Sequence, residues 1–292
     1  MLIKIQRRYH RWKLDRYFAS NANGPIYDLG NGDRIRLYQD EISYKLYIQG
    51  VFEDNNRVLW ERIVQPGMTV FDVGANCGIY SLAASRRVGP SGSVFAFEPN
   101  PRERDKLADN LSLCDHPERG SVTIQIEALG EYAGETQFFI PDSFKGAYGS
   151  IRRPDIEENC LEVGVPITTL DQFLAEQKTP SLDVIKIDVE GNELNILKGG
   201  QAALELQQPL ILIEVSDRRT KVYNYKAREL CDFLLQKCYK LFVCEKLGLD
   251  GQPVISPYKP QDYISYVDIF AVPPRYDLAN LISNGVLVED AS

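Results

Sequence analysis

Short apolar runs alternate with segments of helical periodicity between residues 69 and 272 of this chain. Apolar runs bounded by turn residues predict buried strands, and apolar positions three and four residues apart predict amphipathic helices. The predicted strands cover residues 69–73, 93–97, 121–126, 135–140, 182–187, 209–215, 239–245 and 264–272, and the predicted helices cover 78–88, 101–113, 192–198 and 226–237. This alternation favours a mostly parallel sheet with helices on both faces, and the last two strands predict an antiparallel return.

The segment that precedes this region has a different pattern. The turn Asn31-Gly32-Asp33 lies between two alternating stretches and predicts a β-hairpin. Upstream, Leu2, Ile5, Tyr9 and Trp12 recur at helical spacing, which predicts an amphipathic helix. We therefore expect a helix and hairpin extension over residues 1–58, an α/β domain over 59–275 and a tail over 276–292.

Composition and charge narrow the class of protein. The 292 residues are 44% hydrophobic, which is enough for a large core, and the six cysteines form no metal-binding or redox motif. The net charge is −8, so the body is a poor binder of nucleic acid phosphates. The sequence has no secretory signal and no apolar run of about 20 residues, so we expect a cytoplasmic location.

The basic residues of the first helix leave two interpretations open. Residues 1–16 carry a net charge of +5 within this acidic chain. A basic amphipathic helix can lie on an anionic membrane surface, which predicts a peripheral membrane contact through residues 1–18. The same helix can instead pack against the body of the protein or serve as the arm of a homodimer.

The candidate chemistry begins at a glycine turn that follows the first parallel strand. The turn contains Asp72, Gly74, Asn76 and Gly78, and Glu98 ends the next strand 20 residues beyond the last glycine. A carboxylate at that distance can accept hydrogen bonds from both hydroxyls of a ribose. The two glycines permit a sharp turn and a close ligand. This pattern predicts a site for a nucleoside cofactor.

The turn does not fit a dinucleotide. A dinucleotide site requires Gly-x-Gly-x-x-Gly, but Asn76 replaces the second glycine and Ile79 the third. The turn suits a cofactor without phosphate, whose amino-acid end would bond to Asp72, Asn76 and the turn amides. S-adenosylmethionine is the common cofactor of that description.

Five motifs in order make the chain similar to the FkbM family of S-adenosylmethionine-dependent methyltransferases. They are Asp-Val-Gly-Ala-Asn-x-Gly at 72–78, Glu-Pro-Asn-Pro at 98–101, Thr-Thr-Leu-Asp at 168–171, Ile-Lys-Ile-Asp-Val-Glu-Gly-Asn-Glu at 185–193 and Ile-Glu-Val at 213–215. The resemblance covers roughly residues 60–216. It implies a Rossmann-like methyltransferase fold over 59–275 and O-methylation of hydroxyls on natural products, sugars or glycolipids. It also implies that Glu127 or Ala128 contacts the adenine.

Methyl transfer to a hydroxyl requires a group that accepts its proton. The two histidines, His10 and His116, lie in the basic extension and in a predicted surface turn, so histidine catalysis is disfavoured. Carboxylates are the stronger candidates. Strand alternation places Lys186 and Asp188 on one face, where the lysine requires an ionic partner. We therefore predict that Asp188, Glu190, Lys186 and Glu214 form the catalytic group, with a structural ion network as the alternative.

Two further predictions concern the metal and the acceptor. The carboxylates of Asp188, Glu190 and Glu214 would suit Mg²⁺, although the sequence has no dedicated metal motif. The polar stretch 141–164 reads as a loop at the ligand edge of the sheet, and its Tyr148, Ser150 and Arg152 are candidates for binding a small-molecule or saccharide acceptor.

Two other functions remain open at this point. The first is a non-catalytic subunit that binds S-adenosylmethionine for structure or regulation, and the second is an NAD-dependent sugar-nucleotide enzyme. A methylase of nucleic acid amines is disfavoured, because Asp188-Val189-Glu190-Gly191 stands where such enzymes carry an Asp/Asn-Pro-Pro-aromatic motif.

Overall fold

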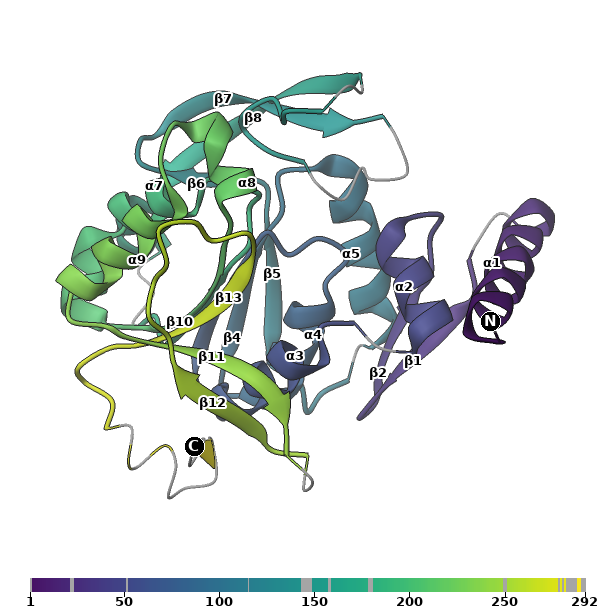
Figure 1. Cartoon of the computed structure of the whole chain (residues 1–292), viewed down its shortest axis with the longest axis horizontal. Helices are drawn as coiled ribbons and strands as arrows, with labels where there is room; N and C mark the ends of the chain where they lie inside the picture. Colours follow the sequence, from purple (N-terminus) through teal and green to yellow (C-terminus); the bar gives the residue numbers. More distant parts are fainter. Residues whose placement is uncertain are drawn as a thin grey trace.

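A twisted central sheet organises the molecule (Figure 1). The computed structural model describes residues 2–21, 24–50, 52–114, 116–142, 149–156, 159–177, 181–248, 251–277, 279, 281 and 288–289. Within these residues the sheet has nine strands in the order β14-β12-β11-β13-β10-β9-β3-β4-β5. Its parallel part consists of β3 (Thr69–Val73), β4 (Ser93–Phe97), β5 (Ser121–Gln125), β9 (Val184–Ile187) and β10 (Leu210–Val215).

The strand order reverses between β3 and β9. The chain runs outward from β3 through β4 to β5 and then returns to form β9 on the other side of β3. In open α/β sheets, ligands bind outside the carboxyl ends of the strands at such a reversal. The topology therefore places the ligand crevice where the glycine turn after β3 faces Asp188 after β9.

The predicted antiparallel return is confirmed. Strand β13 (Val267–Val272) lies between β10 and β11 (Lys240–Leu247) and is antiparallel to both. Two strands were missed: β12 (Pro253–Pro257) lies in a predicted loop, and the edge strand β14 (Val288–Glu289) lies in the predicted tail. Proline at both ends of β12 resembles a loop in sequence, but β12 pairs with β14 only at Val254 and Ile255, so neither proline is needed as a donor in that pairing.

Helices cover both faces of this sheet. One face packs on α3 (Asp54–Ile63) and α4 (Ile79–Val88), and the other on α6 (Leu170–Gln177), α7 (Glu193–Lys198) and α9 (Ala227–Gln236). Helix α5 (Pro101–Leu113) packs through Leu107 on Ala96. Alternation along β9 sends Val184 to the first face and Ile185 and Ile187 to the second. Lys186 therefore projects toward the α4 side.

A smaller sheet stands beside the carboxyl ends of the central strands, at the top of Figure 1. It contains β6 (Ala128–Gly130), β8 (Cys160–Thr169) and β7 (Gly134–Pro141) in that order. The prediction of a loop over 141–164 was therefore wrong for residues 160–164, which form the start of β8. Gly164 and Pro166 lie inside β8 and disguise it in sequence, but pairing with β7 holds it in place.

The N-terminal extension contains the predicted helix and hairpin and one helix that was not predicted. Helix α1 is Leu2–Ser20, and strands β1 (Ile26–Gly30) and β2 (Asp33–Arg36) pair as an antiparallel hairpin. Residues 41–49 were interpreted as alternating but form α2 (Glu41–Gln49). The side chain of Asp40 caps this helix by accepting a hydrogen bond from the Ser43 amide at 2.8 Å. The short helix α8 (Asp217–Thr220) was also missed.

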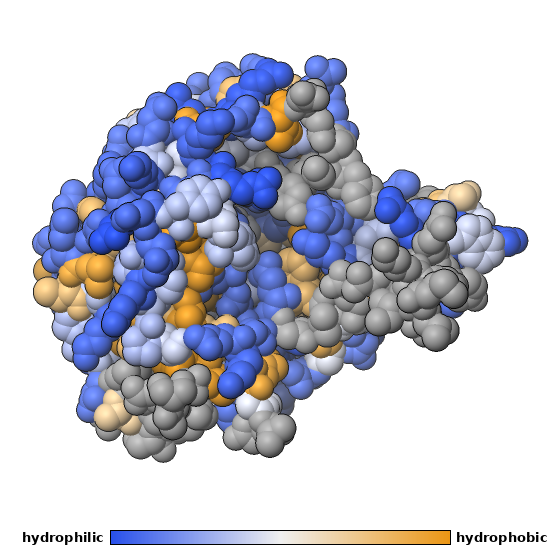
Figure 2. Space-filling view, in the orientation of Figure 1, coloured by the Kyte–Doolittle hydropathy of each residue, from blue (hydrophilic) through white to orange (hydrophobic). Residues whose placement is uncertain are grey.

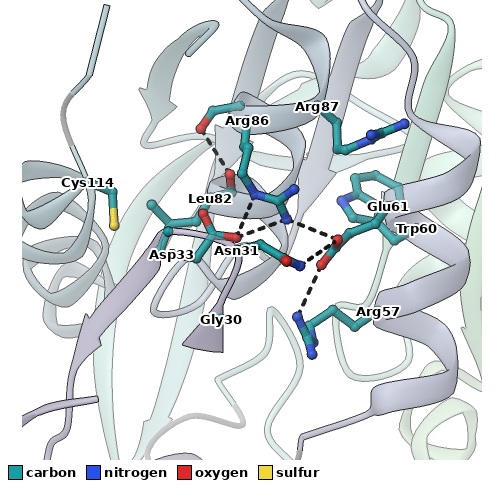
Figure 3. Close-up of polar contacts among 12 residues, drawn as sticks. Gly30, Asn31, Asp33, Arg57, Trp60, Glu61, Leu82, Arg86, Arg87 and Cys114 are labelled. Atoms are coloured by element: carbon teal, nitrogen blue, oxygen red, sulfur yellow. Dashed lines mark hydrogen bonds and ion pairs between the residues drawn. The ribbon is translucent and has the colours of Figure 1, made fainter. Parts of the chain in front are cut away.

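Ion pairs fix the hairpin against the α/β body (Figure 3). The carboxylate of Asp33 is only 2% exposed and lies 3.2 Å from Arg86 and 2.6 Å from Arg119. Arg86 also contacts Glu61 of α3 at 3.0 Å, and Arg57 contacts Glu61 at 3.1 Å. The extension is thereby held rigidly enough for α2 and the segment after it to contribute to a site in the body.

None of the helices within the described residues has both the length and the apolar character needed to cross a bilayer. The face shown in Figure 2 is mostly hydrophilic, with hydrophobic side chains gathered mainly near its centre.

Candidate active site

A cavity of about 290 Å³ opens at the carboxyl ends of the central strands. Ligand pockets usually begin near this size. Five of the residues predicted to bind cofactor line it: Gly74, Asn76, Glu98, Glu127 and Ala128. All four predicted catalytic residues line it as well: Lys186, Asp188, Glu190 and Glu214. The fold thus joins the two predicted groups in one cavity.

Four other predicted site residues do not line the cavity. Asp72 and Gly78 are both buried. Ser150 is buried, with its hydroxyl 2.7 Å from the Tyr223 hydroxyl, and Arg152 is exposed; neither lines the cavity, although their neighbours do. Tyr148 lies outside the described residues.

The carboxylate of Glu98 is held by the backbone in a fixed orientation. It is buried at the end of β4, and its two oxygens accept hydrogen bonds from the amides of Asn76 and Asn100, each at 2.8 Å. Burial raises the pKa of Glu98 to about 8, although both amides oppose the shift. Each oxygen keeps a further lone pair, so this carboxylate can still accept hydrogen bonds from the hydroxyls of a ribose.

The structure gives a reason for the glycines of the turn that the sequence did not reveal. Gly74 has φ +84°, and a Cβ added there would lie 1.9 Å from the carbonyl oxygen of Asp188. Gly78 has φ +92°, and its Cβ would lie 2.4 Å from Leu107. Close packing of the turn against β9 therefore requires glycine at position 74, whether or not a ligand is bound. At position 78 the Leu107 side chain can move, so the positive φ is the stronger reason for glycine.

Asp72 is positioned behind the turn. Its Oδ2 accepts a hydrogen bond from the Ser81 hydroxyl at 2.6 Å, and its Oδ1 is buried without a hydrogen-bond partner among the described residues. Asp72 is also the register neighbour of Lys186 on the adjacent strand. The lysine's charge partly offsets the burial that raises the pKa of Asp72. Asp72 thus contributes to the charge balance of the cavity wall.

Glu127 provides an acceptor at the far end of the cavity. Its Oε2 is buried and has no hydrogen-bond partner among the described residues. Glu127 lines the cavity together with Ala128, beyond Glu98. An amino group on a bound base would satisfy this oxygen, because a buried acceptor without a partner is unfavourable. The site therefore fits an adenosine whose ribose is held at Glu98.

Lys186 is the central cation of the predicted catalytic group. Its ammonium is buried and lies 2.8 Å from Asp188 Oδ2 and 4.5 Å from the centre of the Tyr80 ring. Burial opposes its charge, but the carboxylates of Asp188, Asp72 and Glu53 raise its pKa above the usual value. In turn, Lys186 outweighs burial and lowers the pKa of Asp188. Asp188 is therefore an ionised carboxylate facing the cavity.

Glu190 occupies a strained position beside this pair. Its φ is +62°, in the left-handed region that is costly for a residue with a side chain. Its Oε2 lies 2.6 Å from Arg219 Nε. Burial dominates over this ion pair and raises the pKa of Glu190 to about 8. Backbone strain and a raised pKa at one residue are both features of functional sites.

Two acidic side chains face each other across neighbouring strands. Glu214 on β10 is the register partner of Asp268 on β13. Burial and the nearby carboxylates of Asp188 and Glu190 raise the pKa of Glu214 well above its usual value. Like charges at directly opposed positions destabilise a sheet, so the pair is costly. Sequence reasoning missed Asp268, although an acidic residue inside an apolar strand was a visible signal.

The predicted metal ligands do come together. Carboxylate oxygens of Asp188, Glu190 and Glu214 lie within 4.8 Å of one another. Two of these three groups already have a cationic partner, since Lys186 contacts Asp188 and Arg219 contacts Glu190. The cluster is therefore neutralised in part by the protein itself.

Other residues that line the cavity were not predicted. They come from α2 and the segment after it, from α4, from α8 and from the segment before β13, and those used below are Lys45, Phe52, Glu53, Tyr80, Arg219 and Tyr266. No local periodicity signals them, because they reach the cavity only through tertiary packing.

The polar groups of the cavity limit its ligand. Among the described residues the lining contains six carboxyl groups, at Glu53, Glu98, Glu127, Asp188, Glu190 and Glu214, and three basic groups, at Lys45, Lys186 and Arg219. Burial raises the pKa of Glu98 and of Glu190 to about 8 and that of Glu214 well above its usual value, so these three groups mostly hold protons near neutral pH. The buried oxygens of Glu127 and Glu214 that have no hydrogen-bond partner among the described residues suit a ligand with amino and hydroxyl donors, so S-adenosylmethionine fits the residues present.

The parallel sheet with its antiparallel return, and a ribose-type carboxylate beside a cluster of acids, define an α/β methyltransferase. The family model described as the methyltransferase FkbM domain matches residues 72–241, more than half of the chain, and the chain therefore belongs to the FkbM methyltransferase family. This family membership supports S-adenosylmethionine as the cofactor.

Individual proteins show how far the similarity extends. The hexuronic acid methyltransferase AglP of Haloferax volcanii is 30% identical over 156 residues, covering 52% of this chain and 58% of that protein. The 2-O-methyltransferase NoeI of Sinorhizobium fredii is 26% identical over 216 residues, covering 68% of this chain and 84% of that protein. A crystal structure of methyltransferase FkbM from Methylobacillus flagellatus has a TM-score of 0.42 at 15% identity, covering 80% of this chain and 56% of that chain. This chain thus spans little more than half the length of two of these proteins.

Proposed function

We propose that this protein is an S-adenosylmethionine-dependent O-methyltransferase that acts on a hydroxyl of a sugar, a glycolipid or another natural product. The observation that carries the proposal is that one cavity contains both the ribose-type carboxylate Glu98 and the acidic group around Asp188. The names of NoeI, a 2-O-methyltransferase, and AglP, a hexuronic acid methyltransferase, support an oxygen acceptor on a saccharide.

The cofactor would be held along the carboxyl ends of β3, β4 and β5. Glu98 would accept hydrogen bonds from the ribose hydroxyls, and Glu127 Oε2 with the Ala128 backbone would bind the adenine edge. The amide-rich turn at Gly74 and Asn76 would face the amino-acid end. When bound, S-adenosylmethionine supplies an electrophilic methyl group on a positively charged sulfur.

The acidic group would position the acceptor hydroxyl and receive its proton. The Asp188 side chain is 32% exposed and stays ionised beside Lys186, so it can accept a hydrogen bond from the hydroxyl. Glu190, with a pKa of about 8, has the proton affinity that suits a general base near neutral pH. Glu214, which favours its protonated form, would fix Asp188 by donating to it.

The acceptor would enter beneath the small sheet. Gly149 and Ile151 line the cavity on either side of Ser150, whose hydroxyl is occupied by Tyr223. We therefore propose that this segment contacts the acceptor mainly through its backbone and Ile151. Direct roles for Tyr148, Ser150 and Arg152 stay predictions.

Transfer of a labelled methyl group from S-adenosylmethionine to extracted saccharide and lipid pools tests the proposal, with products identified by mass spectrometry. Asp188→Asn and Glu190→Gln should each reduce labelling strongly while leaving calorimetric binding of S-adenosylhomocysteine nearly unchanged. Binding without labelling in the wild type would instead favour the non-catalytic subunit. Tight binding of NAD without binding of S-adenosylhomocysteine would overturn the cofactor assignment.

We further propose the division into an extension over 1–58, a methyltransferase domain over 59–275 and a tail over 276–292. Membrane contact through residues 1–18, a homodimer and a cytoplasmic location stay predictions. Co-sedimentation with anionic vesicles and light scattering would test the first two. Mg²⁺ is left out of the proposal, since Lys186 and Arg219 already neutralise two of its three candidate ligands.

A further inference from the structure

The part of the cavity beyond Asp188 is built largely by segments outside the residues that match the family model. Glu53 and Phe52 precede the match, which begins at residue 72, and Tyr266 follows its end at residue 241. Glu53 is close to Asp188, and Tyr266 donates a hydrogen bond to Asp268 opposite Glu214, so under the proposed function these residues face the acceptor. Their chemistry therefore bears on which acceptor this chain selects, and the inference drawn from it rests on the function proposed above.

Glu53 is held toward the cavity by an unusual backbone and a buried tyrosine. It joins α2 to α3 with φ +50°, a costly conformation for glutamate. Its Oε2 accepts a hydrogen bond from the Tyr80 hydroxyl at 2.8 Å, and the Tyr80 ring lies beneath the ammonium of Lys186. Burial raises the pKa of Glu53, and the nearby charge of Lys186 opposes this shift while that of Asp188 adds to it. Glu53 thus extends the catalytic group on the acceptor side.

A second pair of acidic side chains, Glu214 on β10 and Asp268 on β13, faces Glu53. Asp268 accepts hydrogen bonds from Asn56 at 2.6 Å and from the Tyr266 hydroxyl at 3.0 Å, and it stands opposite Glu214. Glu214 is 6% exposed and lines the cavity, and its Oε2 has no hydrogen-bond partner among the described residues. A buried acceptor without a partner points to a ligand that donates a hydrogen bond.

Among the described residues, each cation that lines the cavity already contacts a carboxylate within the protein. Lys186 lies 2.8 Å from Asp188, and Arg219 lies 2.6 Å from Glu190. Lys45 lies 3.2 Å from Glu41. An acidic acceptor would therefore have to displace one of these pairs while facing Glu53. A neutral polyol would instead donate hydroxyl hydrogen bonds to the surrounding carboxylates.

We infer that the enzyme selects an uncharged, hydroxyl-bearing acceptor and rejects acceptors that carry a carboxylate or a phosphate near the methylated position. Glu53 is the specificity-determining residue, because it adds a further carboxyl group beside Asp188 from outside the family-matched segment. The inferred acceptor is uncharged, whereas the hexuronic acid in the name of the Haloferax volcanii relative carries a carboxylate. The inference is therefore specific to the residues of this chain.

Pairs of acceptors that differ only in charge test the selection. Methyl hexosides and the matching methyl hexuronides are incubated with full-length protein and methyl-labelled S-adenosylmethionine, and the ratio of kcat/KM is measured for each pair. The neutral member should be favoured by on the order of tenfold or more, which is the scale of one like charge across a partly solvated site. Equal or greater use of the hexuronides overturns the inference and leaves methyl transfer established. Labelling of neither class, with S-adenosylhomocysteine binding intact, overturns the proposed function and this inference with it.

Glu53→Gln tests the residue, since glutamine keeps an acceptor for the Tyr80 hydroxyl but removes the charge. The neutral-to-acidic ratio should fall by on the order of tenfold. Tyr80→Phe is the matched control, because it removes the hydrogen bond between the Tyr80 hydroxyl and Glu53 but keeps the Glu53 carboxyl group. Its neutral-to-acidic ratio should therefore stay close to that of the wild type. An unchanged ratio in Glu53→Gln, or an equal fall in both variants, would refute the assigned role of Glu53.

Discussion

Replacement of Gly74 by alanine separates two explanations of the glycine turn. In sequence, Gly74 suggests room for a ligand, but in the structure its added Cβ would lie 1.9 Å from the carbonyl oxygen of Asp188. The clash is with backbone, which no side-chain rotation relieves. The strands β3 and β9 would have to separate by more than an ångström at the point where the ligand crevice begins.

Replacement of a second glycine, Gly30, gives the part of the lost stability that comes from backbone conformation alone. Gly30 has φ +85°, almost the value of +84° at Gly74, and no atom lies within 4 Å of its added Cβ. Gly30→Ala should therefore cost only about 1–2 kcal/mol for the left-handed backbone. Gly74→Ala should cost the same amount plus about 1–3 kcal/mol for forced overpacking, or about 2–5 kcal/mol in total.

Urea denaturation of both variants gives the two free energies of unfolding, and calorimetry gives the affinity for S-adenosylhomocysteine. We expect Gly74→Ala to be the less stable variant by at least about 1 kcal/mol and to bind the ligand more weakly. If the two variants are equally stable and only Gly74→Ala loses binding, the packing explanation is wrong. The glycine would then serve the ligand directly.

Three more predictions concern the charged groups. Burial raises the pKa of Glu98 from 4.5 to about 8, so the folded protein holds a proton that the unfolded chain releases, and the free energy of unfolding should fall as the pH rises between these values. Urea titrations at about pH 5 and about pH 9 should show that the free energy of unfolding falls less in Glu98→Gln than in the wild type. An equal fall in both proteins would contradict the raised pKa of Glu98. Lys186→Met should destabilise the protein by about 1–3 kcal/mol by leaving the partly buried Asp188 without its cation, whereas Lys186→Arg should lose much less. Equal losses in urea would count against the ion pair. Exhaustive chelation of metal ions should leave the initial rate of methyl transfer unchanged, because Lys186 and Arg219 already contact two of the three clustered carboxylates. A rate that is lost on chelation and restored by Mg²⁺ would show that the cluster binds metal.

Local sequence determined the frame of the fold and much of the cofactor site. Apolar runs predicted β3 and β4 at their observed bounds, since burial on both faces of a parallel strand leaves a continuous apolar segment. Strand alternation placed Lys186 and Asp188 on one face, and the structure has them in contact at 2.8 Å. The Asn31-Gly32 turn predicted the hairpin, because few residues adopt positive φ.

Tertiary structure decided which of these elements meet. Strand β12 and helix α2 escaped prediction, since proline-bounded strands and short capped helices depend on their neighbours more than on their own pattern. Glu53 and Asp268 join the predicted catalytic group from positions more than 200 residues apart in sequence, and their shared interaction with Lys186 and Asp188 arises only in the fold. Periodicity records which face of an element is buried but not which partner covers it. The acceptor end of the cavity is therefore a product of long-range packing, whereas the turn and the carboxylate that would hold the cofactor are encoded within about thirty residues.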